Sequence, residues 1–372
     1  MTRVISADCH INEPPNVFDR VPARLRDRAP KMMRGADGGD GWSFDGAPPK
    51  RTLGIEALAG RAKGDKVSGL RFDEIMPGNY DGSAHVADMD LDGVDVSIVY
   101  PGSAIFVYIE PDRELALACM RSYNDWVLED FQGANARRIV GLPMIPVDDG
   151  VDTAIAELER VAAKGARGGF IPGFPERPYH DPAYDPLWAA AAGSSFPLTF
   201  HRTFGGRPPS EDRDELVDQN VTAAGTAWRF FSAAKPFTYM AFSGMFERHP
   251  ELKIVGAEVN MSWLPFWAQT VDQQFDNQWY QATGAVAIER RPSEFLGENL
   301  FVTVLDDDIG FRMVAEGIAP RLADAAMFST DYPHSVCLWP NTREHVKNLT
   351  AGLTEADKEK ILSGNAARVY GI

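Results

Sequence analysis

The sequence has few cysteines, no long hydrophobic run and a shortage of basic residues, and each shortage excludes a class of protein. Its 372 residues include three cysteines, which cannot all pair and show no C-x-x-C spacing, so a disulfide-rich secreted scaffold is excluded. No stretch approaches about 18 consecutive apolar residues, the length that a membrane span needs. The N-terminal residues also lack the basic and then apolar pattern of a signal peptide, and we therefore expect a cytoplasmic protein.

Positive charge is scarce: 37 Lys and Arg residues stand against 53 Asp and Glu, a formal net charge of −16. Nucleic acids and anionic membranes are bound by clustered Lys and Arg, so neither is expected as a partner. Apolar residues make up 44% of the chain, which is enough for a large core and excludes global disorder. We expect a small-molecule substrate as the partner, and self-association into a homo-oligomer stays open.

Apolar, β-branched runs of about 5–8 residues alternate with segments of helical spacing. The candidate strands are Val4–His10, Val94–Pro101, Ile139–Pro146, Ala166–Pro172, Phe196–Arg202, Leu252–Val259, Asn299–Asp306 and Ala325–Asp331. The candidate helices are Arg113–Phe131, Val151–Ala163, Pro186–Ala192, Trp263–Gln278, Ile309–Gly317 and one that Thr354 begins. This alternation predicts an α/β fold, a (β/α)8 TIM-type barrel that forms a single domain over residues 1–372. An open doubly wound sheet is the rival, and the absence of G-x-G-x-x-G after the first strand weakens it.

Residues 11–85 interrupt the alternation. They are rich in proline and glycine, with Pro14-Pro15 and Pro48-Pro49 among them, and carry scattered charge. We interpret them as an insertion after the first strand that lies over the barrel mouth, because long loops in compact domains tend to be functional. Residues 204–220, after the fifth strand, are expected to form a second loop over the same mouth.

Polar residues stand at the strand ends, where barrel enzymes carry their chemistry. The first strand ends in Asp8-Cys9-His10, and because side chains alternate, Asp8 and His10 face the same way while Cys9 faces the core. The fifth strand ends at His201 and the eighth at Asp331. Any one of these residues alone could be a hydrogen-bonded rim residue or a helix cap. Together, two imidazoles and two carboxylates predict a site for Zn, Mn or Fe.

The fourth strand excludes one kind of site for two metal ions. It ends in the run 168–172, Gly-Gly-Phe-Ile-Pro, and supplies no lysine that could be carboxylated into a bridge between two metal ions. Any second metal ion would therefore need carboxylate side chains as its bridges.

Several motifs in order carry a family resemblance. They are Asp8-Cys9-His10 with Glu13-Pro14, His201, His249-Pro250-Glu251-Leu252-Lys253, Ser329-Thr330-Asp331-Tyr332-Pro333-His334 and the closing run 365–371. With these motifs the chain resembles the amidohydrolase superfamily over nearly its whole length. More narrowly, it resembles the amidohydrolase-related branch that includes aminocarboxymuconate semialdehyde decarboxylase. The resemblance implies a metal ion held by Asp8, His10, His201 and Asp331.

One residue departs from that branch. Its decarboxylases and lactone hydrolases have a histidine at the end of the strand that follows His-Pro-x-Leu-Lys, and here that position is Glu258. Glu258 has three possible roles: a general base whose pKa is raised by burial, a hydrogen-bond acceptor for Asn260 or a backbone amide, or a metal ligand.

The number of carboxylates separates two functional hypotheses. Asp8, Glu258 and Asp331, with Glu13 or Asp306 as further candidate ligands, make the mouth similar to the di-iron hydroxylase branch known from platensimycin and platencin biosynthesis. That similarity favours a non-haem di-iron monooxygenase, with two Fe per chain, that hydroxylates a largely apolar natural-product acid or thioester. The alternative is a Zn or Mn decarboxylase or hydrolase with one metal ion, which acts on a carboxylate-bearing substrate with Glu258 as base.

His334 is expected to contribute to catalysis without binding the metal ion directly. It follows Asp331 by three residues, and Pro333 fixes the turn between them. From that position it could orient Asp331 or meet an anionic group of the substrate. A third hypothesis, a barrel that only binds a ligand, is disfavoured because all four expected metal ligands are retained.

Overall fold

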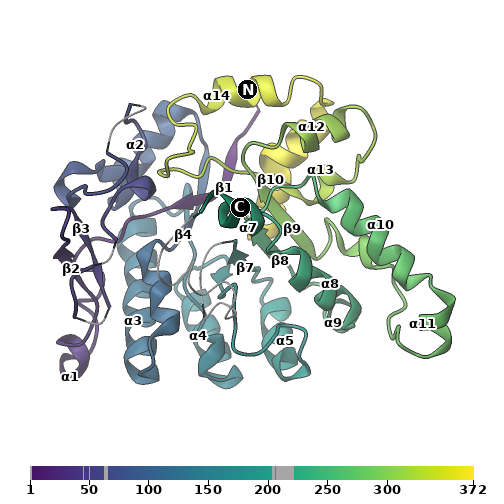
Figure 1. The fold of residues 1–372 in the computed structure, drawn as a ribbon, viewed down its shortest axis with the longest axis horizontal. Helices are drawn as coiled ribbons and strands as arrows, with labels where there is room; N and C mark the ends of the chain where they lie inside the picture. The colour runs from purple at the N-terminus through teal and green to yellow at the C-terminus, as the bar shows by residue number, and fades with distance from the viewer. Residues whose placement is uncertain (1, 45, 50, 63–65, 203–205, 207–221) are drawn as a thin grey trace.

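Eight parallel strands form the centre of the molecule (Figure 1). The computed structural model describes residues 2–44, 46–49, 51–62, 66–202, 206 and 222–372. The strands are β1 (Ile5–His10), β4 (Val96–Tyr100), β5 (Ile139–Gly141), β6 (Gly169–Phe170), β7 (Leu198–His201), β8 (Ile254–Ala257), β9 (Leu300–Val304) and β10 (Ala326–Phe328). Each lies inside a predicted strand, so the eight sequence-based assignments are confirmed.

The strands form two parallel sheets that meet at both edges. The first sheet has the order β1-β4-β5 and the second β10-β9-β8-β7-β6. On one side the amide of Phe170 donates to the carbonyl of Pro143 at 2.8 Å, and on the other the amide of Asp331 donates to the carbonyl of Asp8 at 3.0 Å. The fold is the predicted TIM-type barrel, and the second contact puts Asp8 and Asp331 side by side.

Helices surround the strands (Figure 1). Those that match predicted helices are α3 (Arg113–Trp126), α4 (Val151–Ala163), α5 (Asp185–Gly193), α10 (Leu264–Phe275), α12 (Asp308–Ala315) and α15 (Glu355–Glu359). The others are α1 (Ala23–Arg26), α2 (Gly82–Asp92), α7 (Ala223–Arg229), α8 (Ala234–Phe242), α9 (Met245–Arg248), α11 (Gln278–Ala282), α13 (Leu322–Ala325), α14 (Thr342–Leu349) and α16 (Asn365–Tyr370). As predicted, Thr354 caps α15, since its Oγ1 accepts from the amide of Asp357 at 3.1 Å.

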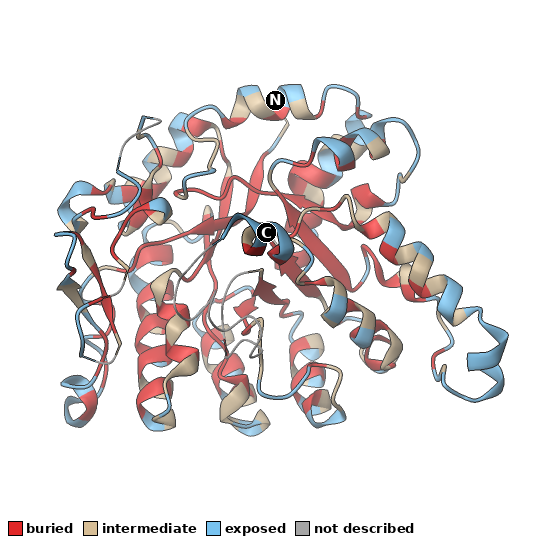
Figure 2. Ribbon diagram, in the orientation of Figure 1, coloured by how far each residue is buried: buried red, intermediate tan, exposed pale blue. Residues whose placement is uncertain are grey.

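The core follows from this arrangement. Every residue of β4 and of β9 is buried, because helices cover one face of each strand and side chains fill the barrel behind the other. Figure 2 shows the buried strands at the centre and the exposed outer faces of the helices. In the described part of the chain, no helix combines the length and the apolar character needed to cross a membrane.

The segment 11–85 has structure of its own. It contains α1 and an antiparallel hairpin of β2 (Lys31–Arg34) and β3 (Asp40–Ser43), and it runs into the start of α2. The predicted loop 204–220 lies outside the described residues, with the exception of residue 206.

Glu13, a candidate metal ligand from the sequence, instead anchors a loop at the mouth. Its buried carboxylate accepts hydrogen bonds from the backbone amides of Gly102 (2.8 Å), Ser103 (2.9 Å) and Ala104 (3.2 Å). Burial nevertheless raises the pKa of Glu13 to about 7. The anchored loop begins the 3-10 segment Ser103–Ile109, so Glu13 acts on the position of that segment.

We expect Glu13→Gln to lower the free energy of unfolding by about 1–3 kcal/mol, because the amide nitrogen would face backbone donors. Since the pKa of Glu13 is raised in the folded state, the wild type loses stability as this group ionises. The difference in free energy of unfolding between the wild type and Glu13→Gln should therefore narrow as pH rises from about 5 to about 8. Urea unfolding at several pH values measures this, with exposed Glu316→Gln as a control that should not change stability. A fall in bound metal in Glu13→Gln would instead make Glu13 a ligand.

Candidate metal centre

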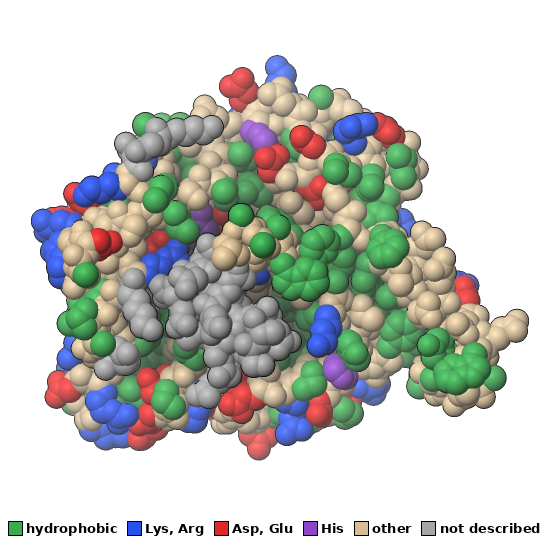
Figure 3. All heavy atoms as spheres, in the orientation of Figure 1, with side chains coloured by type: hydrophobic (Ala, Val, Ile, Leu, Met, Phe, Trp, Pro, Cys, Tyr) green, Lys and Arg blue, Asp and Glu red, His purple; other side chains and the backbone are tan. Residues whose placement is uncertain are grey.

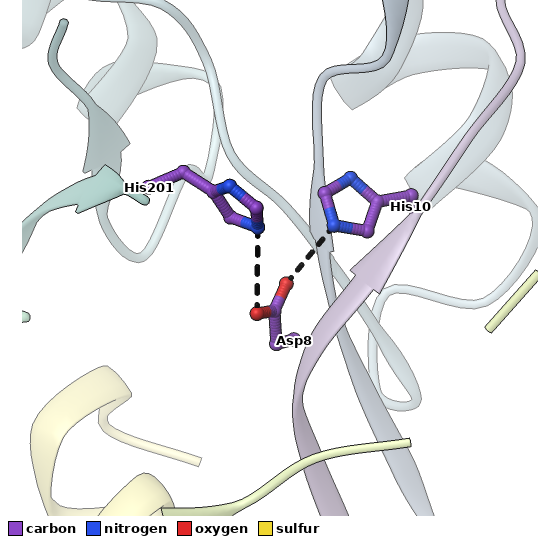
Figure 4. A group of neighbouring side chains, drawn as sticks. All are labelled: Asp8, His10 and His201. Carbon is purple, nitrogen blue, oxygen red and sulfur yellow. Dashed lines mark ion pairs between the residues drawn. The ribbon is translucent and has the colours of Figure 1, made fainter. Parts of the chain in front are cut away.

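Three of the four predicted ligands meet inside the barrel. Asp8 and His10 leave the same face of β1, and His201 approaches from the end of β7 (Figure 4). Nε2 of His10 lies 3.3 Å from Oδ1 of Asp8, and Nε2 of His201 lies 3.6 Å from Oδ2 of the same carboxylate. All three side chains are buried, and their ligand atoms lie within 4.8 Å of one another. The alternation of side chains on β1 therefore places Asp8 and His10 on the same face, as predicted.

Asp331, which follows the neighbouring strand β10, completes the group. Its Oδ1 lies 3.4 Å from Nε2 of His10 and 2.8 Å from Nδ1 of His334. The ring of His334 stacks on that of His10 with centroids 4.0 Å apart. Asp331 adopts a left-handed backbone conformation with φ of 53°, which costs a non-glycine residue about 1–3 kcal/mol. His334 thus lies against Asp331, as predicted. Its ring nitrogen, a ring nitrogen of His10 and a carboxylate oxygen of Asp331 also lie within 4.8 Å of one another, close enough to share a metal ion.

The group fits a divalent cation because its buried polar atoms lack partners. Among the described residues, Oδ1 of Asp8, Nε2 of His10 and both carboxylate oxygens of Asp331 make no hydrogen bond. Their mutual contacts are close but do not have hydrogen-bond geometry. Buried acceptors without partners are expensive, and a cation is the partner that two carboxylates and neutral imidazoles share.

The pKa values also favour a cation. Burial opposes the ionisation of Asp8, but the charge of His201 and the close approach of both histidine ring nitrogens lower its pKa below the usual range. Burial and repulsion by Glu258 raise the pKa of Asp331 well above the usual range. Burial lowers the pKa of His10, so its imidazole is neutral and can donate a lone pair. A cation placed among these groups would relieve the repulsion that disfavours ionised Asp331.

Glu258 lies beside the cluster and pairs with an arginine that the sequence analysis did not single out. Its Oε1 accepts from Nη2 of Arg202 at 2.5 Å, while its Oε2 lies 3.3 Å from Nε2 of His201. Burial opposes ionisation, but the charge and hydrogen bond of Arg202 outweigh it and lower the pKa of Glu258. Of the three roles left open for Glu258, a base whose pKa is raised by burial is therefore wrong, and the metal-ligand role stays a prediction. Asn260, the suggested partner, bonds to the carbonyl of Asp306 instead.

Sequence reasoning also missed Thr303, on β9. Its hydroxyl donates to Oδ2 of Asp8 at 3.2 Å and accepts from the amide of Glu258 at 2.6 Å, so one side chain connects two carboxylate residues. A threonine inside a strand is an ordinary β-former, and nothing in the sequence marks it. Arg202, by contrast, directly follows His201 at a strand end, so its position in the sequence could have marked it as a candidate site residue.

Two candidates take no part in the cluster. Asp306 is exposed, and the structure groups neither it nor Glu13 with the candidate ligands. Cys9 faces away as predicted, since its thiol donates to Oγ of Ser6 at 3.0 Å. Burial raises the pKa of Cys9 to about 11, which makes it unreactive.

A cavity of about 440 Å³ opens above the cluster, lined by His10, His201, Glu258, Asp331 and His334. The other lining side chains include the aromatic group Trp42, Phe44, Tyr100, Phe106, Phe170 and Phe174 and the arginines Arg51, Arg202 and Arg229. Trp42, Phe44 and Arg51 come from the segment 11–85, which therefore forms part of the wall.

Hydrophobic side chains also lie outside the cavity. On the face shown in Figure 3 they gather over α7, α8 and α10. Trp228, Tyr239 and Phe266, one from each of these helices, are exposed to solvent. Helix α7 therefore presents polar Thr226 and Arg229 to the cavity and an aromatic side chain to solvent.

Comparison with solved structures finds the same fold in an amidohydrolase and in two decarboxylases. An amidohydrolase of Mycobacterium avium subsp. paratuberculosis K-10 is 19% identical, with a TM-score of 0.76 over 100% of this chain and 98% of that chain. The 5-carboxyvanillate decarboxylase LigW of Sphingomonas paucimobilis is 22% identical, with a TM-score of 0.69 over 100% of both chains. A dihydroxybenzoic acid decarboxylase of Polaromonas sp. JS666, with bound manganese and the inhibitor 2-nitroresorcinol, is 21% identical (TM-score 0.65; 100% and 97% covered).

Comparison at the level of sequence gives the family. A search of curated proteins found no match. The family model described as Amidohydrolase matches residues 95–372, which is more than half of the chain. The chain therefore belongs to the amidohydrolase family.

Proposed function

We propose that the protein is a metal-dependent decarboxylase that acts on an aromatic or similarly apolar carboxylic acid. The observation that carries the proposal is the cavity: it combines a floor of buried metal-ligand side chains, aromatic walls and arginine side chains. An acid with a flat apolar body matches such a cavity in charge and in shape. The decarboxylase activity of two structural relatives supports the same reaction class.

In this proposal Asp8, His10, His201 and Asp331 hold a divalent ion, with manganese or zinc preferred. When bound, the ion supplies a positive charge that polarises a substrate oxygen. Thr303 fixes the orientation of Asp8 through its hydroxyl, and the stacked ring of His334 limits the movement of His10.

Decarboxylation breaks the bond between the carboxylate and its carbon, and the carbon keeps the electron pair and takes up a proton. His334 is placed to relay that proton from solvent at the cavity mouth, because its ring lines the cavity and its Nδ1 is held 2.8 Å from Oδ1 of Asp331. Burial lowers the pKa of His334 to about 4, so the resting imidazole is neutral. Aromatic walls exclude water from the reacting carbon.

The di-iron monooxygenase, favoured by the count of carboxylates, receives less support. A second iron ion needs further carboxylate ligands, but Glu13 binds backbone amides and Asp306 is exposed. Glu258 approaches His201, yet its other oxygen is held by the positive charge of Arg202. The alternative with one metal ion uses only side chains that the structure brings together.

The first test of this function is release of CO2. Manganese-loaded protein should release CO2 from members of a panel of aromatic carboxylic acids, without consuming dioxygen. His201→Ala should lose most bound metal and most activity while remaining folded, because the ligand lies at the strand end rather than in the core. Metal content, circular dichroism and CO2 assays measure these outcomes. Full metal retention in His201→Ala, or turnover that requires dioxygen, would contradict the proposal.

Glu258→Gln tests which role this residue has. We expect the variant to keep its metal ion and to lose about 10–100-fold in turnover, because the amide no longer balances and holds the guanidinium group of Arg202, whose hydrogen bond to a charged group is worth about 1.5–3 kcal/mol. A loss of metal would show that Glu258 is a ligand. Unchanged turnover, with stability lower by about 1–3 kcal/mol, would leave it only as the acceptor of the Arg202 hydrogen bond.

Metal affinity should increase with pH. The pKa of Asp331 is raised by burial and by the repulsion of Glu258, so a proton competes with the ion for this carboxyl more strongly than at an ordinary aspartate, and binding releases the proton wherever it is held. Below the raised pKa the proton competes with the ion, and above it the competition ends. Calorimetry in two buffers with different ionisation enthalpies counts the protons released. Affinity that does not rise with pH, with no proton released on binding, would show that Asp331 is not protonated in the metal-free protein.

A further inference from the structure

Arg202 differs from the other cavity arginines in how it is held. It directly follows the ligand His201, and its backbone amide donates to the carbonyl of Ala257 at 3.1 Å, next to Glu258 on the neighbouring strand. Its guanidinium group stacks on the ring of Phe230, 4.4 Å from the ring centroid, and donates to Glu258. The backbone, the ring and the carboxylate therefore fix both the position and the plane of this cation.

The fixed guanidinium retains donors that the described protein does not use. Glu258 accepts from Nη2 alone, and Nη1 makes only a long contact of 3.4 Å with the carbonyl of Thr226. Nε is buried and has no hydrogen-bond partner among the described residues. Arginine has five N–H donors in one plane, and a buried donor without a partner is costly.

An oxyanion in the cavity would satisfy the remaining N–H donors of Nη1 and Nη2. Arg202 lines the cavity together with His201 and Asp331, so a group bound by Arg202 lies next to the candidate metal ligands. A planar guanidinium group binds a carboxylate through two parallel hydrogen bonds, and its partial burial strengthens the pairing. The neighbouring Glu258 cannot supply both bonds, because its second oxygen is directed to His201.

We propose that Arg202 binds the carboxylate of the substrate and so selects organic acids over their neutral analogues. The inference rests on the proposed decarboxylase function for the class of substrate, but the binding step can be measured without turnover. Glu258 holds the guanidinium group in place and balances its charge before the substrate enters.

The other arginines of the cavity provide the comparison. Arg51 pairs with Glu56 at 3.1 Å, and Nη2 of Arg229 donates to the hydroxyl of Thr226 at 3.0 Å. Neither is next to a candidate metal ligand in the sequence. Arg229 is thus a matched alternative: the same residue type lines the same cavity but contacts a different partner.

The experiment compares benzoate with benzamide, its neutral analogue of similar shape, by calorimetry on the manganese-loaded protein. We expect the wild type to prefer benzoate. Arg202→Met should weaken benzoate binding about 10–100-fold, the value of a hydrogen-bonded charge pair, and should change benzamide binding less than about twofold. Arg202→Lys keeps the positive charge beside Glu258 but loses the planar guanidinium group, so it should fold and keep part of the preference for benzoate.

Three outcomes would overturn the proposal. The first is an unchanged preference for benzoate in both Arg202 variants. The second is a preference that Arg229→Met removes and Arg202→Met retains. The third is loss of manganese by Arg202→Met, since Arg202 would then act on the metal ion rather than on the acid.

Failure of the inference is distinguishable from failure of the proposed function. If benzoate selectivity depends on Arg202 but no aromatic acid releases CO2, the binding site stands and the decarboxylase assignment fails. If CO2 is released with the same KM and kcat in the wild type and in Arg202→Met, the decarboxylase stands and the inference fails.

Discussion

The structure of the mouth depends on one constraint, which is the burial of two carboxylates beside two imidazoles with too few hydrogen-bond donors between them. The backbone bond between the amide of Asp331 and the carbonyl of Asp8 joins β10 to β1 and makes this closeness unavoidable. A low-dielectric site can hold two such carboxylates only with a compensating positive charge. The surrounding side chains are arranged around that requirement: Thr303 steadies Asp8, and His334 lies against Asp331.

The same constraint orders the events of binding. Before an ion is present, burial and the repulsion of Glu258 and Asp8 raise the pKa of Asp331, and an incoming organic anion would meet further negative charge. After a divalent ion is present, that negative charge is compensated and the arginines of the wall dominate the cavity. With the proposed function, an acid is therefore expected to find a favourable site only in the metal-loaded protein, which is why loading and acid binding have to be measured separately.

The barrel and the meeting of its candidate metal ligands could be predicted from the sequence because both depend on local periodicity. Alternation on β1 places Asp8 and His10 on one face, and the strand ends of a parallel barrel meet at one rim, so His201 and Asp331 follow. The roles of Glu13 and Glu258 could not be predicted in this way. The contacts of Glu13 lie about 90 positions away at Gly102–Ala104, and no local pattern encodes them.

Counting carboxylates without placing them gave the di-iron hypothesis more weight than the structure supports. The expectation that burial raises the pKa of Glu258 omitted the charge on the neighbouring strand, although Arg202 and Glu258 follow paired strand residues, His201 and Ala257. Where related enzymes are expected to have one imidazole, this chain has the ion pair of Glu258 and Arg202. The replacement of that histidine by Glu258 is therefore understood only together with Arg202. A carboxylate alone at that position would add repulsion to a site already rich in negative charge. Paired with a guanidinium group, it keeps the site near neutrality and fixes a planar cation beside the metal ligands, and the chemistry of the mouth depends on both residues.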